Sequence, residues 1–536
     1  MGVWFTSWRI CSTFLPNFRC VLFGLKCITS RDVTIAKRVR FFTIRPDIIH
    51  EQRENELYTV QVGHCEDVSG IRKLAHRVFR RFKPKQVRVE EVSNDYDYMT
   101  TAKFSENLCK IIPLMVNLRR YKIVWEMPDS NVPTPYIDLS WKHFAPTLTE
   151  LHLVLSHSKT SSALPPTGIS FPHLETFNLS LSFDNPFGRA EHSSYMGAQS
   201  AVADYVNSLR SSLKKLAIRC TPPMNLSHLY SHLDHFEKLD DLYLDISLDE
   251  GPNRPGPSAS AAFIGKHSQK IRSLSLFVFV ESAGATWDSP ERQFTLDGLF
   301  LPNLSALHMS AAVLFSNVQA SIPTFFAQQA PSLKELSFGG PLAINVRLPL
   351  VLQGLNQQNP SNSLSSLSFF SAYLDSALLN NLAVSLPLLQ TLALDIREVT
   401  SRGRYLSMPS DTFPESSDIV RLCKSLHGLL LSFMILQSTV SHPFIQEMSL
   451  HHSFKSWRLR DLTIKRHSCC GDLFLWGLMA FCAHHIPSID SFMGSGSLSI
   501  PNPQNVKPTR GPIWCADLVC RYGQDHKVWG LDELTL

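Results

Sequence analysis

A degenerate pattern, P-x-L-x-x-L-x-L, recurs along most of this chain and constrains its fold more than any other feature. Residues 330–338, APSLKELSF, are a clear copy. The last residues of the pattern alternate apolar and polar, which is typical of a short strand with one buried face. The proline ends the preceding helix, because it lacks an N–H group and disfavours helical geometry in the residue before it. The repeated unit is therefore a helix, a stop and a strand.

Twelve copies of the L-x-x-L-x-L core follow one another at an average spacing of about 31 residues, which is typical of a solenoid. We call the first residue of each copy its lead residue. Proline stands two residues before the lead residue in five copies, where 33 prolines in 536 residues would place fewer than one by chance. The lead residues are Leu118, Leu148, Leu174, Leu213, Leu239, Ile271, Leu304, Leu333, Leu364, Leu389, Leu426 and Leu459.

The segments between these strands often have helical spacing, so the unit consists of a strand, a loop and a helix. Three inward apolar side chains from each strand would stack on those of the neighbouring units, and the helices would close the other side. The sequence thus predicts an α/β, leucine-rich-repeat-like solenoid with irregular units of about 31 residues and short parallel strands on the concave face. Degenerate strands at 39–44 and 486–492 extend the array.

This pattern divides the chain into three segments. Residues 1–35 are an N-terminal segment without periodicity, residues 36–492 are the solenoid, and residues 493–536 are a Gly/Ser/Pro-rich loop with a C-terminal cap. A cap is expected because an uncapped terminal unit would expose its core. Regular leucine-rich repeats place Asn or Cys eight residues past the lead position, but this chain does not. We therefore expect no asparagine ladder along the turns that follow the strands.

Composition excludes several classes of protein. The 51 basic and 46 acidic residues give a net charge of only +5, too even to indicate a nucleic acid or an anionic membrane as partner. The twelve cysteines are too sparse for a disulfide scaffold. No apolar run is long enough to span a bilayer, and no clean signal peptide is present. We expect a monomer in the cytoplasm or nucleus, with neither nucleic-acid nor membrane partners.

Catalytic and metal-binding motifs are not evident. The sequence contains none of the patterns G-x-S-x-G, G-x-x-x-x-G-K-[ST] and H-E-x-x-H, so we expect no enzymatic activity and no cofactor. Zinc would need four converging ligands, usually from two spaced pairs, and Cys469 and Cys470 are adjacent. We therefore interpret the following cluster as buried thiols and capping histidines: His467, Cys469, Cys470, Cys482, His484 and His485. The N-terminal residues MGVWFT fit the permissive myristoylation pattern, which is too short to predict that Gly2 is lipidated.

Alternation along each strand places the residue four positions past the lead residue on the outward face. We predict that these residues form a protein-binding surface, with Tyr243 and Lys122 as the favoured anchors because aromatic and basic residues dominate many interfaces. The alternative surface is the rim formed by the Pro/Gly/Ser-rich loops that follow the strands. The predicted binding residues are Lys122, His152, Asn178, Tyr243, Ser275, His308 and Ser337.

The degenerate P-x-L-x-x-L-x-L units, together with AKRVRFFTI at 36–44, resemble fungal F-box/leucine-rich-repeat-like proteins over roughly residues 36–492. This resemblance implies that the repeats hold a protein substrate. It also implies that an N-terminal F-box binds the Skp-type linker subunit of a cullin-RING ligase. The chain would then be the substrate-recognition subunit of an SCF-type ubiquitin ligase.

The N-terminal segment departs from that family. Within residues 1–35, only Leu15-Pro16 and Val21-Leu22-Phe23 are similar to the start of an F-box. The F-box is therefore degenerate, absent or lost from the gene prediction. The alternative function is a leucine-rich-repeat binding scaffold with no ubiquitin-ligase connection.

Overall fold

The structure is a computed structural model, and the part of the chain that it describes forms two compact units. The N-terminal unit comprises residues 1–222 and 232–237, and the C-terminal unit comprises 223–231 and 238–536. The predicted solenoid segment thus divides into two parts, each of which is described by itself. The described residues are 33–46, 101–126, 134–182, 192–221, 225–247, 258–279, 298–315, 317, 319–340, 343–357, 363–401, 404–405, 452–466, 486, 488–489, 491–494, 498–501, 513–514 and 527–528.

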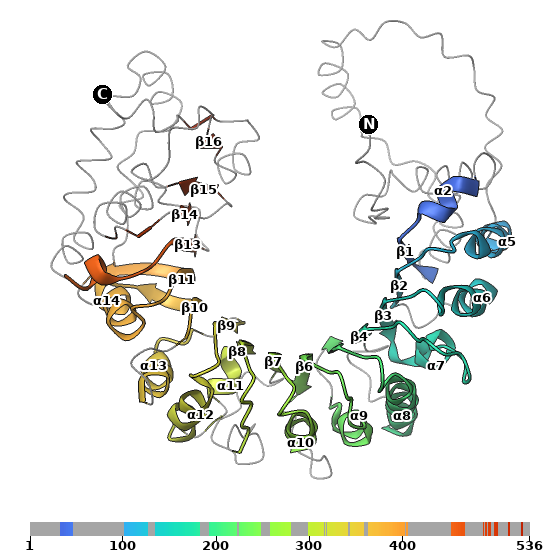
Figure 1. Ribbon diagram of the computed structural model, residues 1–536, viewed down its shortest axis with the longest axis horizontal. Coiled ribbons are helices and arrows are strands. Elements are labelled where there is room, and N and C mark those ends of the chain that lie inside the picture. The colour runs from blue at the N-terminus through green and yellow to red at the C-terminus, as the bar shows by residue number, and fades with distance from the viewer. Residues whose placement is uncertain are drawn as a thin grey trace, which may run out of the picture. The chain divides into compact units, whose positions relative to one another are not determined.

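The N-terminal unit pairs five strands in one parallel sheet, and its helices lie along one side of that sheet (Figure 1). The first residue of each strand pairs with the first residue of the next. The strands are β1 (Phe41–Ile44), β2 (Arg120–Trp125), β3 (Glu150–Ser156), β4 (Thr176–Ser182) and β5 (Lys215–Thr221). The helices are α2 (Val33–Arg38), α5 (Thr101–Ile111), α6 (Pro135–Phe144), α7 (Thr160–Ala163) and α8 (His192–Ser208), with 3-10 turns η2 (Ile112–Leu114) and η3 (His157–Lys159).

The C-terminal unit repeats this arrangement with eight parallel strands, again paired first residue to first residue. They are β6 (Asp241–Ser247), β7 (Ser273–Phe279), β8 (Ala306–Ser310), β9 (Glu335–Gly339), β10 (Ser366–Leu374), β11 (Thr391–Ser401), β13 (Asp461–Arg466) and β14 (Ser491–Gly494). The helices are α9 (Ser227–His232), α10 (Ser258–Lys266), α11 (Ala311–Phe315), α12 (Ser321–Gln329), α13 (Leu348–Gln357) and α14 (Ser376–Ser385), with the 3-10 turn η5 (His452–Ser456).

Short antiparallel additions complete the described strands. Strand β12 (Arg404–Tyr405) pairs with the end of β11, and β15 (Leu498–Pro501) pairs with β14. Strands β16 (Ile513–Trp514) and β17 (Lys527–Val528) form a separate two-stranded sheet. The fold is therefore an α/β, leucine-rich-repeat-like solenoid built on parallel strands, as the repeat pattern predicts.

The repeat pattern places the strands correctly. Eleven lead residues are described, and each parallel strand begins two residues after one of them; the same offset holds for Val39 and Ile489. The twelfth lead residue, Leu426, lies outside the described residues. Strand β11 pairs directly with β13, with Thr391 opposite Asp461, so the sheet holds no strand between them.

Apolar side chains at the inward positions form the core. In all eleven described copies, the lead residue and the residues three and five positions later are at most 3% exposed. In the N-terminal unit, the ring of Tyr121 stacks on Phe42 and meets Trp141 and Phe144 edge-on. A single repeat could not bury these residues alone, so the stacking of neighbouring repeats stabilises the array.

Hydrogen bonds join successive repeats where each strand begins. The backbone carbonyl of Arg119 accepts hydrogen bonds from the N–H groups of Thr149 and Glu150, at 2.8 and 3.0 Å. The same paired contact recurs from repeat to repeat within each unit. Its further acceptors are Arg40, Thr149, Glu175, Asp240, Arg272, Ser305, Lys334, Ser365 and Gln390.

Side chains support the same turn. The residue just before the lead residue donates to a carbonyl of the preceding repeat in several copies. Ser363 Oγ donates to Leu333 O at 2.8 Å, and Ser488 Oγ donates to Leu459 O at 2.8 Å. The other cases are Thr147 to Leu118, Asn117 to Lys37 and Asn303 to Gln269. These side-chain bonds therefore lie at the helix-to-strand turn, instead of at the turn where regular leucine-rich repeats place an asparagine ladder.

Candidate functional site

The seven predicted binding residues occupy equivalent positions in successive strands. We call the outward residues four positions past the lead residues the middle row. In the N-terminal unit, backbone register pairs Lys122 with His152 and His152 with Asn178. All of these side chains are half-buried.

The C-terminal unit brings together the other four. Tyr243 pairs with Ser275, Ser275 with His308, and His308 with Ser337, and all four side chains are half-buried. The structure thus arranges the predicted residues as one continuous row in each unit. The functional assignment of these residues stays a prediction.

A chain of polar contacts crosses the middle row of the N-terminal unit. Glu150 Oε2 accepts from Arg120 Nε at 2.7 Å, and its Oε1 lies 2.5 Å from His152 Nε2. Asn178 Nδ2 lies 2.9 Å from the same imidazole nitrogen. Because His152 Nε2 can donate to Glu150 or accept from Asn178 but not do both, the tautomer of His152 selects between two hydrogen-bond arrangements.

Aromatic rings lie beside the middle row of the C-terminal unit. The rings of Tyr243 and Phe277 stack with centroids 5.2 Å apart and planes 20° apart. A Cβ atom at Gly339 would lie 3.1 Å from Phe277 Cε1, so the absence of a side chain there leaves room for the ring. His308 Nε2 is 3.8 Å from Glu335 Oε1, which is an ion-pair distance when the imidazole is protonated and too long for a hydrogen bond.

The charged side chains on the outward face of the sheet differ between the N-terminal and the C-terminal unit. On β2 to β5, the outward positions carry Arg120, Lys122, Lys215 and Arg219, with Glu150 as the carboxylate among them. On β6 to β13, the described side chains at these positions include five carboxylates and no lysine or arginine. The five are Asp241, Asp245, Glu335, Asp395 and Asp461, of which Asp245 is buried. By strand alternation, two basic residues, Arg397 on β11 and Lys465 on β13, also fall at outward positions, with Lys465 opposite Asp395 in register.

The prediction from the sequence therefore missed much of each face. Arg120, Glu150 and Phe277 lie two positions from middle-row residues on their strands and also point outward. The period of two along a strand could have found them, because residues two positions before and after an outward residue share its face.

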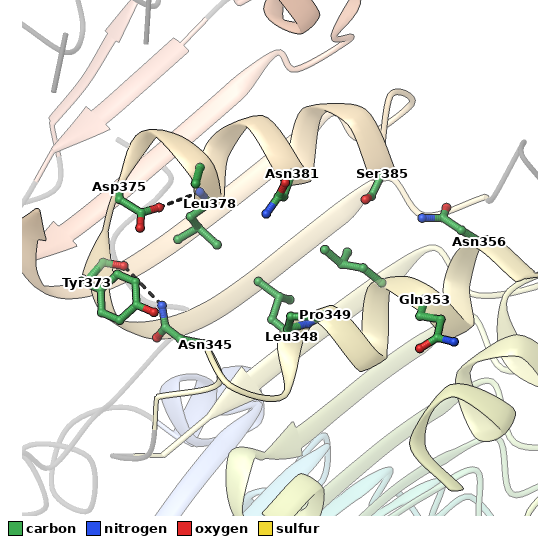
Figure 2. A pocket seen from close by; sticks show the side chains of 12 residues that line it. Asn345, Leu348, Pro349, Gln353, Asn356, Tyr373, Asp375, Leu378, Asn381 and Ser385 are labelled. Carbon is green, nitrogen blue, oxygen red and sulfur yellow. Dashed lines mark hydrogen bonds between the residues drawn. The ribbon is translucent and has the colours of Figure 1, made fainter. Parts of the chain in front are cut away.

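A groove of about 460 Å³ lies on the helix side of the C-terminal unit, between α13 and α14. Figure 2 shows Leu348 of α13 and Leu378 of α14 entering it from opposite sides. Asp375 is the charged side chain in its lining, and its carboxylate accepts the Leu378 N–H at 2.7 Å as the cap of α14. Asn345 accepts the Ala372 N–H at 2.8 Å. These polar groups hold the chain's own backbone, and the repeat pattern gave no signal of the groove.

Among the described residues, no group of three or more His, Cys, Asp or Glu side chains could hold a metal ion. The Cys/His cluster between His467 and His485 lies outside the described residues. Burial raises the pKa of the Cys109 thiol, which disfavours the reactive thiolate. No described helix is both long enough and apolar enough to cross a bilayer.

Neither a protein-family model nor a curated protein sequence matches the chain. Among solved structures, a similar chain occurs in the one described as "Crystal structure of Rad7 and Elc1 complex in yeast". The identity is 14% and the TM-score is 0.35, over 56% of this chain and 76% of that chain. A likeness at this level does not bear on what the present chain binds.

Proposed function

We propose that this chain is a protein–protein interaction module that binds its partner on the outward face of the sheet. The observation that carries this proposal is the alignment of half-exposed middle-row side chains in each unit. A row of varied polar and aromatic groups on a rigid sheet can recognise an extended protein surface. We also propose that the chain has no catalytic activity of its own and acts as a monomer without nucleic-acid or membrane partners.

Within this class, we propose the role of substrate-recognition subunit of an SCF-type ubiquitin ligase. Its support is the resemblance of the repeats and of residues 36–44 to F-box/leucine-rich-repeat-like proteins. In this role the sheet face holds the substrate, and an N-terminal F-box binds the Skp-type linker. The alternative is a binding scaffold of the same fold with no ligase connection, which the degenerate segment 1–35 favours.

Simultaneous substitution of the middle row tests the binding surface. The variant Lys122→Glu, His152→Glu and Tyr243→Lys should release proteins that co-purify with the wild-type chain. A matched control changes exposed helical residues, with Gln357→Glu and Asn381→Lys, and should retain them. If both variants keep every partner, the rim loops become the better candidate for the binding surface.

Co-purification with the Skp-type linker separates the two roles. The assay should compare this chain with a form whose 5′ end is re-mapped from the transcript. Linker binding by either form supports the ligase role. Binding by neither form contradicts it and leaves the scaffold.

A further inference from the structure

The C-terminal unit concentrates carboxylates and aromatic rings on one sheet face. We call this the acidic-aromatic face, and its accessible members are Asp241, Tyr243, Phe277, Glu335, Phe370, Asp395 and Asp461. We propose that this face binds a basic segment of a partner protein, whose arginine or lysine side chains pair with the carboxylates and lie over the rings. This inference rests on the proposed function and specifies the chemistry of the partner.

The rings provide the first part of the argument. Tyr243 and Phe277 stack at 5.2 Å and remain half-exposed. Phe370 is also half-exposed on β10. A guanidinium or ammonium group within about 6 Å of an aromatic centroid is attracted by the negative face of the ring. Half-exposed outward rings on a polar sheet are therefore suited to a cationic side chain.

Carboxylates flank these rings along the sheet. Asp241 lies two residues before Tyr243 on β6, so both point to the same face. On the other side, Asp395 pairs with Phe370 in register. Between them, Glu335 is exposed, and its contact with His308 is 3.8 Å long. A segment crossing these strands would thus meet carboxylates and rings together, which is the combination that holds arginine best.

The N-terminal unit supplies a comparison within the same chain. Its outward positions on β2 to β5 carry four cations, one carboxylate and no Phe, Tyr or Trp. A basic segment would be repelled there and attracted to the acidic-aromatic face. Nucleic acid is disfavoured on the acidic-aromatic face because phosphates would meet four accessible carboxylates. The observations therefore favour a basic protein segment as the occupant.

The test uses the full-length chain and a fluorescent peptide of alternating arginine and serine, with binding followed by anisotropy. We expect saturable binding that weakens as salt is added, because salt screens exposed charges. A peptide of alternating glutamate and serine should not compete. Absence of arginine-peptide binding, or effective competition by the glutamate peptide, would overturn the inference.

Substitutions then locate the binding site. Tyr243→Leu with Phe277→Leu keeps apolar side chains but removes both aromatic faces, and should weaken binding about tenfold. Glu335→Gln, at an exposed position, should weaken it about threefold. The control on the helix side of the other unit, Lys142→Gln at an exposed position of α6, should leave the affinity unchanged. Binding that resists the first two changes, or that is lost in the control, would contradict the proposal.

Two further results separate this inference from its premises. If the arginine peptide does not bind but the middle-row variant still releases its partners, the chemistry assigned to the partner is wrong and the binding surface stands. If the arginine peptide does not bind and the middle-row variant also keeps its partners, the proposed function fails as well. Concentration-dependent dimers in sedimentation, abolished by Lys122→Glu, would identify the occupant as a second copy of this chain and overturn the assignment to another protein.

Discussion

At the scale of single residues, two buried tyrosines of the N-terminal unit differ in how their hydroxyl groups are satisfied. Tyr121 donates to Ser140 Oγ at 3.2 Å, and Ser140 Oγ donates to Tyr136 O at 2.6 Å. Tyr205 packs edge-on against the rings of Phe171 and Phe177, and among the described residues its hydroxyl has no hydrogen-bond partner. Burial raises the pKa of both hydroxyls above their usual range.

This difference predicts opposite effects of removing each hydroxyl. Tyr205→Phe should raise the free energy of unfolding by about 1 kcal/mol, because an unsatisfied buried hydroxyl is costly. Tyr121→Phe should lower it by about 1 kcal/mol, because the bond to Ser140 is lost. Urea denaturation measures both values. Equal destabilisation by the two changes would contradict the hydrogen bonding described for them.

The raised pKa values also predict a loss of stability in alkali. Unfolded tyrosine ionises near pH 10, whereas the buried hydroxyls of Tyr121 and Tyr205 keep their protons there. Above about pH 10 the unfolded state thus binds fewer protons than the folded state, so stability falls as pH rises. Urea unfolding at pH 8 and pH 11 measures the loss. It should be smaller in Tyr121→Phe, and an unchanged loss in that variant would exclude Tyr121 as a source.

At the scale of single elements, the turn before each strand joins one repeat to the next. Ser363 Oγ lies within 3.3 Å of three carbonyl oxygens, those of Ala330, Pro331 and Leu333. Ser363 itself follows Asn362, whereas Thr147 and Asn303, which make the same kind of bond, follow Pro146 and Pro302. Sequence spacing locates the turn, and the side chain just before the lead residue supports it.

Removing such a side chain should weaken the junction between repeats. Ser363→Ala should lower the free energy of unfolding by about 1 kcal/mol, as expected for one lost hydrogen bond. His173 takes the same place before Leu174 and is exposed, and the structure shows no such bond from its side chain. His173→Ala should therefore change stability by less than about 0.5 kcal/mol. Similar losses in the two variants would mean that the serine bonds do not stabilise the turn.

Packing between helices depends on a glycine at one point. A Cβ atom at Gly354 of α13 would clash with Pro323 O and lie 2.8 Å from Phe326 Cβ of α12. Gly354→Ala should therefore destabilise the fold by about 1–3 kcal/mol through overpacking. Gly265 of α10 has no atom within 4 Å of such a Cβ, so Gly265→Ala should be neutral or stabilising. Thermal unfolding of both variants tests the contrast, which a stable Gly354→Ala variant would contradict.

At the scale of the whole molecule, the sequence predicted the array and its strands because each repeat needs the same three buried positions. It also placed the seven middle-row residues, since outward and inward positions alternate along a strand. It did not reveal the segregation of charge, because neighbouring residues on the face lie about 30 residues apart in sequence and meet only through register. Nor did it reveal the groove beside α13, which depends on how closely adjacent helices approach.

The copy of the repeat at Leu426 lies outside the described residues, so its predicted strand stays a prediction, while β11 bonds directly to β13. Division into two compact units was also not apparent, because the spacing of the repeats continues through both. Local sequence patterns encode a single repeat, whereas long-range strand pairing decides which repeats join in one sheet.

A disulfide cross-link tests the register of the middle row most directly. Ser275 and His308 are register partners on adjacent strands, and neighbouring strands lie about 4.8 Å apart, within the range that a disulfide spans. Tyr243 and His308 are separated by β7, so about twice that distance divides them. Ser275→Cys with His308→Cys should form a disulfide-linked peptide, detected by mass spectrometry after mild oxidation, whereas Tyr243→Cys with His308→Cys should not. Linkage of the second pair without the first would contradict the aligned row on which both proposals depend.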